Sequence, residues 1–121
     1  MFETEFDKAK NLLRMAFCGH VTADEAKQGT DELAALLVDA GSGFRLLTDL
    51  TGLEQMDSEC VPYIRKSMDF LNKKGVAMVV RVIPDPHKDI GFNILSLFHY
   101  RHDIQIVTCK TLEEAMSALA G

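Results

Sequence analysis

The segment VAMVVRVI, residues 76–83, constrains the fold more than any other part of the chain, because it is apolar at nearly every position. A strand with one solvated face alternates apolar and polar residues, whereas a strand of a parallel sheet is covered on both faces and loses that alternation. Gly75 stands directly before the segment, where it can end a preceding helix. We therefore expect residues 76–83 to form a strand that is buried on both faces.

Apolar residues elsewhere predict further strands. Phe2 and Phe6 mark an opening strand, and the next one, LLRMAFC, has inward candidates at Leu13, Met15 and Phe17. FRLLTDL is typical of a short strand of about six residues. IQIVTC, near the end of the chain, is typical of a last short strand.

Helical patterns separate these strands. Thr22 and Glu25 form a capping box, which predicts a helix from about Ala23 to Ala40 with Gly41 as its stop. The second helix lies between FRLLTDL and Gly75, and its core stripe is expected at Val61, Ile64, Met68 and Leu71.

Two more helices are expected in the last third of the chain. IGFNILSLFHY, residues 90–100, is mostly apolar and predicts the third helix. Thr111 and Glu114 form a second capping box. It predicts a terminal helix whose inward residues are Leu112, Ala115, Met116 and Leu119.

This order of elements predicts an α/β fold. Strands separated by helices are most simply joined by right-handed crossovers into parallel pairs, so only the opening strand pair need be antiparallel. We expect a mostly parallel sheet of about five strands packed by about four helices. A chain of 121 residues suffices for one core, so residues 1–121 are expected to form a single domain.

Composition narrows the classes of function. The formal charge of −5 disfavours binding to a phosphate backbone, and no nucleic-acid partner is expected. No apolar run approaches the ~20 residues of a membrane span, and no secretory signal is evident, so a cytoplasmic protein is expected. Cys18, Cys60 and Cys109 lack metal-binding or disulfide spacing and fit free thiols.

Asp57 and Ser58 stand between a strand and a helix. The Ser58 hydroxyl can cap the helix, or it can carry a phosphate, and both interpretations stay open at this point. Asp57 can hold the loop through backbone N–H groups. Asp49, expected at a strand end, can be functional or can form a turn bond with Thr51 or Gly52.

The stretch LLTDLTGLEQMDSECVPYIRKSMDFLNKKGVAMVV, residues 46–80, resembles the STAS domain of anti-sigma factor antagonists, in which a strand ending in Asp-Leu precedes an Asp-Ser pair, a helix, a glycine and an apolar strand. AFCGHVTADEA and TLEEAMSAL extend the similarity over almost the whole chain. The resemblance implies the STAS, or SpoIIAA-like, fold. It also implies that Ser58 is phosphorylated by a partner that is both kinase and anti-sigma factor, and that the unphosphorylated form binds this partner.

Glu59 and Cys60 stand where the family has a small residue and then glycine. A related SpoIIAA-like branch lacks an established switch serine. It implies the alternative function, the binding of a small apolar ligand or lipid between the sheet and residues 90–100.

A protein-binding surface is expected around the aspartate–serine pair and along the helix that follows. Its candidate residues are Asp57, Glu59, Tyr63, Ser67 and Phe70, which would face the partner or a second copy in a homodimer. His99 and His102 have a loose metal-ligand spacing, with His87 and Asp103 as further candidates, but a polar helix end is the preferred interpretation and no metal is expected. No catalytic set or cofactor motif emerges, so we expect neither an enzyme nor a cofactor.

Overall fold

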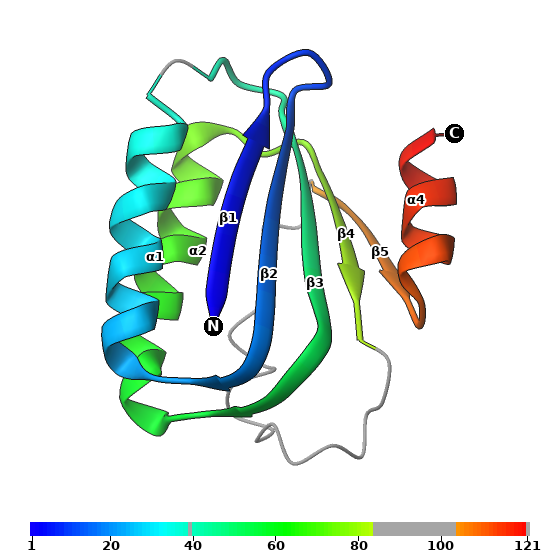
Figure 1. Cartoon of the computed structure of the whole chain (residues 1–121). Helices are drawn as coiled ribbons and strands as arrows, with labels where there is room; N and C mark the ends of the chain where they lie inside the picture. Colours follow the sequence, from blue (N-terminus) through cyan, green and yellow to red (C-terminus); the bar gives the residue numbers. More distant parts are fainter. Residues whose placement is uncertain (39, 84–103, 121) are drawn as a thin grey trace.

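The computed structural model describes residues 1–38, 40–83 and 104–120, which build one sheet with helices on both faces (Figure 1). The strand order is β1-β2-β3-β4-β5. β1 pairs with β2 antiparallel, and the other neighbouring pairs are parallel, as the sequence predicted. The strands span Phe2–Asp7 (β1), Leu12–Val21 (β2), Arg45–Met56 (β3), Met78–Val82 (β4) and Gln105–Cys109 (β5).

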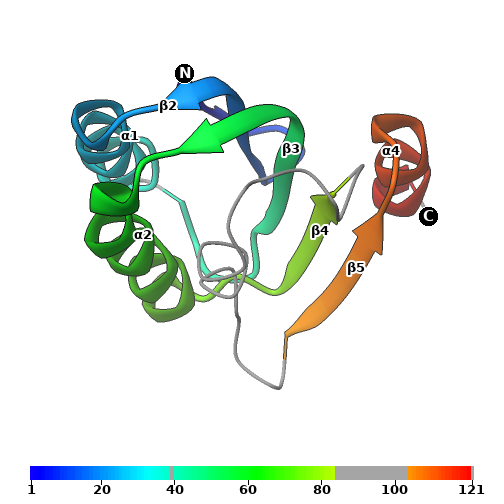
Figure 2. The same ribbon diagram turned by 90° about the horizontal axis from the view of Figure 1, so that it is seen from below.

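Helices cover the two faces unequally. α1 (Ala23–Leu36) joins β2 to β3, and α2 (Val61–Lys74) joins β3 to β4. Both lie on one face of the sheet, whereas α4 (Leu112–Ala120) lies on the opposite face beside β4 and β5 (Figure 2). The helix expected at residues 90–100 lies outside the described residues.

The larger core lies between the sheet and the pair α1 and α2. All three expected inward residues of β2, namely Leu13, Met15 and Phe17, are buried there. The rings of Phe2 and Phe17 pack with centroids 4.3 Å apart. From α2, Ile64, Met68 and Leu71 are buried as predicted, while Val61 is only half-buried at the start of the helix.

A smaller core lies between the sheet and α4. Its buried members are Leu47, Val80, Val82, Cys109 and Ala115. Val79, the neighbour of Val80, belongs to the larger core instead. β4 is therefore buried on both faces, which confirms the prediction from its apolar sequence.

Two helix predictions need correction. α1 ends at Leu36, short of the expected Ala40. Leu37 and Ala40 lie after the helix but are still buried. Their apolar side chains continue the helical spacing for this reason, which is why the predicted helix was too long. In α4 only Ala115 is buried, while Leu112 and Met116 are 37% and 48% exposed, because this short helix contacts the sheet along a narrow stripe.

β3 is twice as long as expected, with 12 residues. Its pairing with β4 stops at Asp49, but pairing with β2 continues to the couple Val21 and Met56. Residues 18–21 and 52–56 thus form a two-stranded extension, here named the β2–β3 ribbon. It curves toward the first turns of α1 and α2 (Figure 1). Asp49 is therefore inside a strand and not at its end, contrary to expectation.

Candidate functional site

The candidate site lies at the end of the β2–β3 ribbon, where the β2–α1 and β3–α2 junctions meet. Parallel neighbouring strands end at the same edge of a sheet, so their following turns lie side by side. The Asp57 N–H donates to the Val21 carbonyl at 3.1 Å, and the Cys60 N–H donates to the Asp57 carbonyl at 3.0 Å. Ser58–Cys60 forms a single 3₁₀ turn before α2 begins at Val61. We name residues 57–60 the switch turn.

His20 and Asp57 connect the two junctions through their side chains. The His20 Nε2 atom lies 2.6 Å from Asp57 Oδ1, with the two side chains 51% and 32% exposed. The register of β2 against β3 shifts between Gly19 and His20, and Gly19 has a φ of +64°. Such a bulge re-aims the side chain that follows it, and glycine adopts this φ without strain.

Ser58 is exposed and does not cap a helix. Its hydroxyl donates to Glu59 Oε2 at 3.4 Å, and no side chain among the described residues caps either the 3₁₀ turn or α2. The cap interpretation is therefore wrong, because the 3₁₀ turn separates Ser58 from the first α-helical residue, Val61. The expected role of Asp57 also changes, since its carboxylate contacts His20 while its backbone holds the turn.

Cys60 is the buried residue that holds the switch turn against the core. Its side chain is fully buried, and its Sγ donates to the Val21 carbonyl at 3.5 Å. Burial raises the pKa of the Cys60 thiol to about 11, and the nearby charges of Asp57, Glu59 and Glu25 act in the same direction. The thiol is thus protonated at neutral pH, the opposite of the activated cysteine that a helix start can create.

The neighbouring β2–α1 junction has the predicted capping box. Thr22 Oγ1 accepts the Glu25 N–H at 3.4 Å, and Glu25 Oε1 accepts the Thr22 N–H at 3.2 Å. Glu25 Oε2 also lies 3.1 Å from the Met1 ammonium. The pKa of Glu25 is lowered, chiefly by its hydrogen bond with that ammonium and next by the Thr22 N–H.

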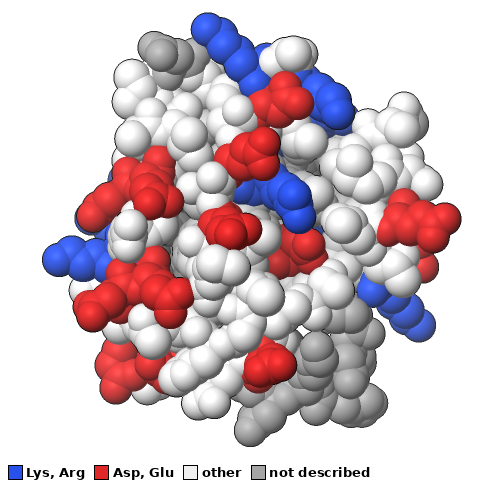
Figure 3. Space-filling view, in the orientation of Figure 1, with Lys and Arg blue, Asp and Glu red and all other residues white. Residues whose placement is uncertain are grey.

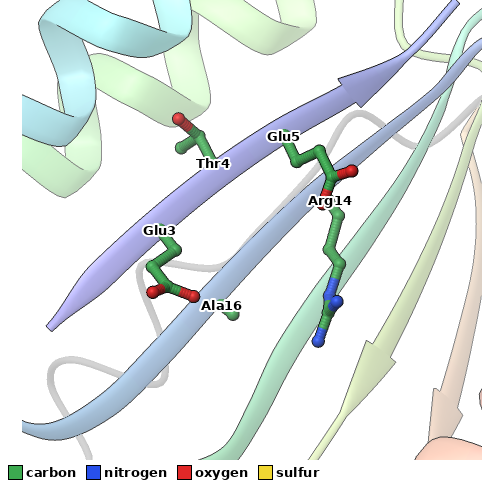
Figure 4. Close-up of a pocket in the computed structure, with 5 residues that line it drawn as sticks. All are labelled: Glu3, Thr4, Glu5, Arg14 and Ala16. Carbon is green, nitrogen blue, oxygen red and sulfur yellow. The ribbon is translucent and has the colours of Figure 1, made fainter.

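Asp49 lies away from this site, on the face of the sheet that α1 and α2 leave open. Its Oδ1 accepts the Thr51 N–H at 2.9 Å, which confirms the expected turn bond. Its Oδ2 lies 3.7 Å from Arg14 Nη2. Figure 4 shows Arg14 beside its cross-strand neighbour Glu5, and Figure 3 shows basic atoms among acidic ones over this face. These contacts account for Asp49 as part of a charged sheet surface.

Ser67 was expected on the protein-binding surface, but it is fully buried. Its Oγ lies 2.9 Å from Thr30 Oγ1, which also donates to the Ala26 carbonyl at 2.8 Å. Ser67 therefore belongs to the contact between α1 and α2 and does not lie on that surface. Tyr63 and Phe70 are half-buried against the larger core, so only part of each ring faces solvent.

Sequence reasoning missed His20. The signal was its place two residues before the Thr22 cap, at the end of a strand parallel to the one that leads into Ser58. His87, His99, His102 and Asp103 lie outside the described residues. Within residues 1–38, 40–83 and 104–120, no three histidine, cysteine or acidic side chains are grouped so as to hold a metal ion.

Comparisons with known proteins identify the fold. No family model matches the chain, and no curated protein matches it in sequence. Among solved structures, the anti-sigma factor antagonist SpoIIAA in its unphosphorylated form superposes with a TM-score of 0.67 at 16% identity, covering 100% of this chain and 99% of that one. The chain has the SpoIIAA-like fold.

Two further structures share the SpoIIAA-like fold. An uncharacterised DUF3478-family protein from Shewanella loihica PV-4 gives a TM-score of 0.69 at 15% identity, over 98% of this chain and 92% of that one. The Bacillus cell fate determinant SpoIIAA in its phosphorylated form gives 0.65 at 17% identity, over 98% and 99%. The STAS-like architecture expected from sequence is thus confirmed, and identities this low establish the fold alone. Among the described residues, every helix is too short or too polar to cross a membrane.

Proposed function

We propose that the protein is a regulatory protein-binding module of the cytoplasm, with Ser58 as its phosphorylation site and the switch turn as its contact surface. The observation that carries this proposal is the exposed Ser58 hydroxyl on a turn whose backbone is held on both sides, at the carboxyl end of β3. The SpoIIAA-like fold supports it, because SpoIIAA has been solved in both phosphorylated and unphosphorylated forms.

A phosphate would act on this turn mainly through its charge. It adds about −1.5 to −2 charges at neutral pH. Asp57 and Glu59 flank Ser58, so the modified turn would be strongly anionic and would repel a partner surface that accepts the neutral hydroxyl. The turn itself would keep its place, because its backbone bonds to Val21 and within residues 57–60 do not involve the serine side chain.

The proposed partner is an anti-sigma factor or a similar kinase, and no catalytic step is assigned to this chain. The surface it would contact comprises the exposed Glu59, the half-exposed Asp57 and the solvent-facing parts of Tyr63 and Phe70. Partly exposed aromatic rings anchor protein interfaces, and the same surface could hold a second copy in a homodimer. Glu59 replaces the small residue of the resembling antagonists, so it would select a partner with a complementary basic group.

Capture from the native host tests this proposal. The unmodified protein, used as bait, should retain a specific protein, which is then identified by mass spectrometry. Ser58→Asp should weaken this capture at least about tenfold, because a charge is placed in the contact surface. Ser117→Asp is the matched control, since Ser117 is exposed on α4 at the other face of the sheet. Equal capture by all three proteins, together with an unmodified Ser58 in protein from the host, would contradict the proposal.

A groove beside α4 supports a second candidate function, the binding of a small anionic amphiphile. The groove has a volume of about 340 Å³ and is lined by Lys10, Leu12, Arg45, Met116, Leu119 and Ala120. The Arg45 guanidinium donates to the Leu119 and Lys10 carbonyls at 2.7 and 3.2 Å. Apolar walls beside cationic side chains fit a fatty acid. The cleft expected between the sheet and residues 90–100 lies outside the described residues.

Titration with the fluorescent fatty acid cis-parinaric acid tests the second candidate. Met116→Glu should abolish saturable binding, because it places a negative charge in the groove next to the carboxylate and removes apolar surface. Ile106→Glu is the matched control, because Ile106 is an exposed apolar residue of β5 outside the groove. Equal binding by both variants would exclude the groove.

A further inference from the structure

The contact between His20 and Asp57 points to a second residue in the switch. We propose that His20 acts together with Ser58 in the switch. While Ser58 is unmodified, His20 contacts Asp57, and once Ser58 carries a phosphate, a protonated His20 binds that phosphate. This inference rests on the proposed function, because it concerns the same serine. It assigns a role to a side chain on a different strand, β2, which lies 38 positions before the serine in sequence.

The geometry brings the imidazole to the switch turn in advance. His20 Nε2 lies 2.6 Å from the carboxylate of Asp57, and Ser58 is the next residue of the same turn, with Cα atoms of consecutive residues ~3.8 Å apart. The Nε2–H group donates to an oxygen acceptor whether the ring is neutral or charged. The backbone of the turn is fixed, whereas the His20 side chain is half-exposed and can rotate. In the proposed exchange the His20 side chain rotates from Asp57 toward Ser58 while the backbone of the turn stays in place.

The charges around the turn favour such an exchange. The groups that act on the buried Cys60 from this end of the sheet are Asp57, Glu59 and Glu25, all acidic. Among the described residues, the Met1 ammonium pairs with Glu25, and His20 contacts Asp57 through Nε2, a contact that is an ion pair when the imidazole is protonated. Met1 also donates to the Cys18 carbonyl, so its ammonium is already held twice. A protonated His20 would offset the charge of a phosphate, whose dianion attracts an imidazolium more strongly than one carboxylate does.

The exchange would give the switch a second effect. In the unmodified protein the His20 contact joins the β2–α1 junction to the switch turn and occupies one oxygen of the Asp57 carboxylate. Once His20 turns to the phosphate, the Asp57 carboxylate loses this contact and adds its charge to the surface. Phosphorylation would then change two neighbouring side chains of the contact surface through one imidazole.

Phosphoserine installed at position 58 by genetic-code expansion allows a direct test on the whole chain. The ³¹P chemical shift is followed with pH to give the second pKa of the phosphate, ordinarily about 6. His20→Asn should raise this pKa by several tenths of a unit, because it removes a cation that stabilises the dianion. His20→Lys should restore a low value. Glu59→Gln is the matched control, and it should lower the pKa by removing an adjacent negative charge.

The result that overturns the proposal is a His20→Asn titration that coincides with the wild-type curve while Glu59→Gln shifts it. Circular dichroism of each variant confirms that it is folded, and His20→Gln provides a second neutral replacement should the asparagine variant fail to fold. Because the phosphoserine is incorporated during translation, this result does not depend on whether the host phosphorylates Ser58. A low phosphate pKa that requires His20 would stand even if the capture experiment failed.

Discussion

Two strand-to-helix junctions lie side by side at the end of the β2–β3 ribbon, and they are built in opposite ways. The β2–α1 junction is closed by side chains, because Thr22 and Glu25 satisfy each other's backbone N–H groups. The β3–α2 junction is closed by backbone bonds and by the buried Cys60, and its polar side chains make no cap. A serine that carries no structural bond to the backbone is available for chemistry. The contrast explains why Ser58, and not Thr22, is the candidate switch.

The largest expected effect is on the rate at which the Cys60 thiol, buried beneath the switch turn, reacts with an alkylating reagent. Its pKa rises from an ordinary 9.0 to about 11, so its thiolate fraction at pH 8 falls by about a hundredfold in the folded protein, and burial blocks access as well. Iodoacetamide should therefore label Cys60 at least about a hundredfold more slowly in the native protein than in urea. The exposed Cys18 is the internal control. Rapid native labelling of Cys60 would show that the turn opens.

Next in size is the dependence of α2 on packing. Because α2 has no side-chain cap within the described parts of the chain, its attachment to the sheet should depend on its buried stripe. Ile64→Ala should lower the free energy of unfolding by about 2 to 5 kcal/mol, as measured by urea denaturation. Val61→Ala, at the half-buried start of the same helix, should cost clearly less. Similar losses for the two variants would contradict the packing account.

A smaller effect compares the two junctions directly. Thr22→Ala removes the cap of α1 and should lower the free energy of unfolding by about 1 kcal/mol. Ser58→Ala removes only a 3.4 Å contact with Glu59, so its change should stay within about 0.5 kcal/mol. Urea denaturation of both variants measures the difference. If Ser58→Ala were as costly as Thr22→Ala, Ser58 would have a structural role after all.

The smallest effect is the pH dependence that Glu25 contributes at the capped junction. Its pKa in the folded protein lies below the ordinary 4.5, so its stabilising contribution is complete above that value and is lost as the pH falls through the lowered folded pKa. Glu25→Gln should therefore flatten the acid limb of the stability curve below about pH 4.5 and lower the stability above that pH, where Glu25 is ionised. The partly exposed position keeps this effect small. An unchanged acid limb would show that the Met1 contact has no energetic weight.

Local sequence patterns correctly predicted those features that depend on one short segment. The Thr22 and Glu25 box, the αL glycine at Gly75 and the continuous apolar run of β4 each depend on a few neighbouring residues, and all three were predicted. The same holds for the parallel topology, because helices between strands leave few ways to connect them. Ser67 shows what local patterns cannot predict. The sequence placed it on an exposed helix face, whereas in the structure α1 packs against it.

The sequence by itself determined the order of strands and helices, the antiparallel opening pair and the place of Ser58 in a strand-to-helix junction. Tertiary structure decided the length of β3, because within the part of the chain that the structure describes the second half of that strand pairs with the distant β2 alone. It also decided that Ser58 is free of the helix and that His20 meets Asp57. His20 and Asp57 are 37 positions apart in sequence. Local propensity cannot predict their contact, because the parallel register between β2 and β3 brings the two residues together.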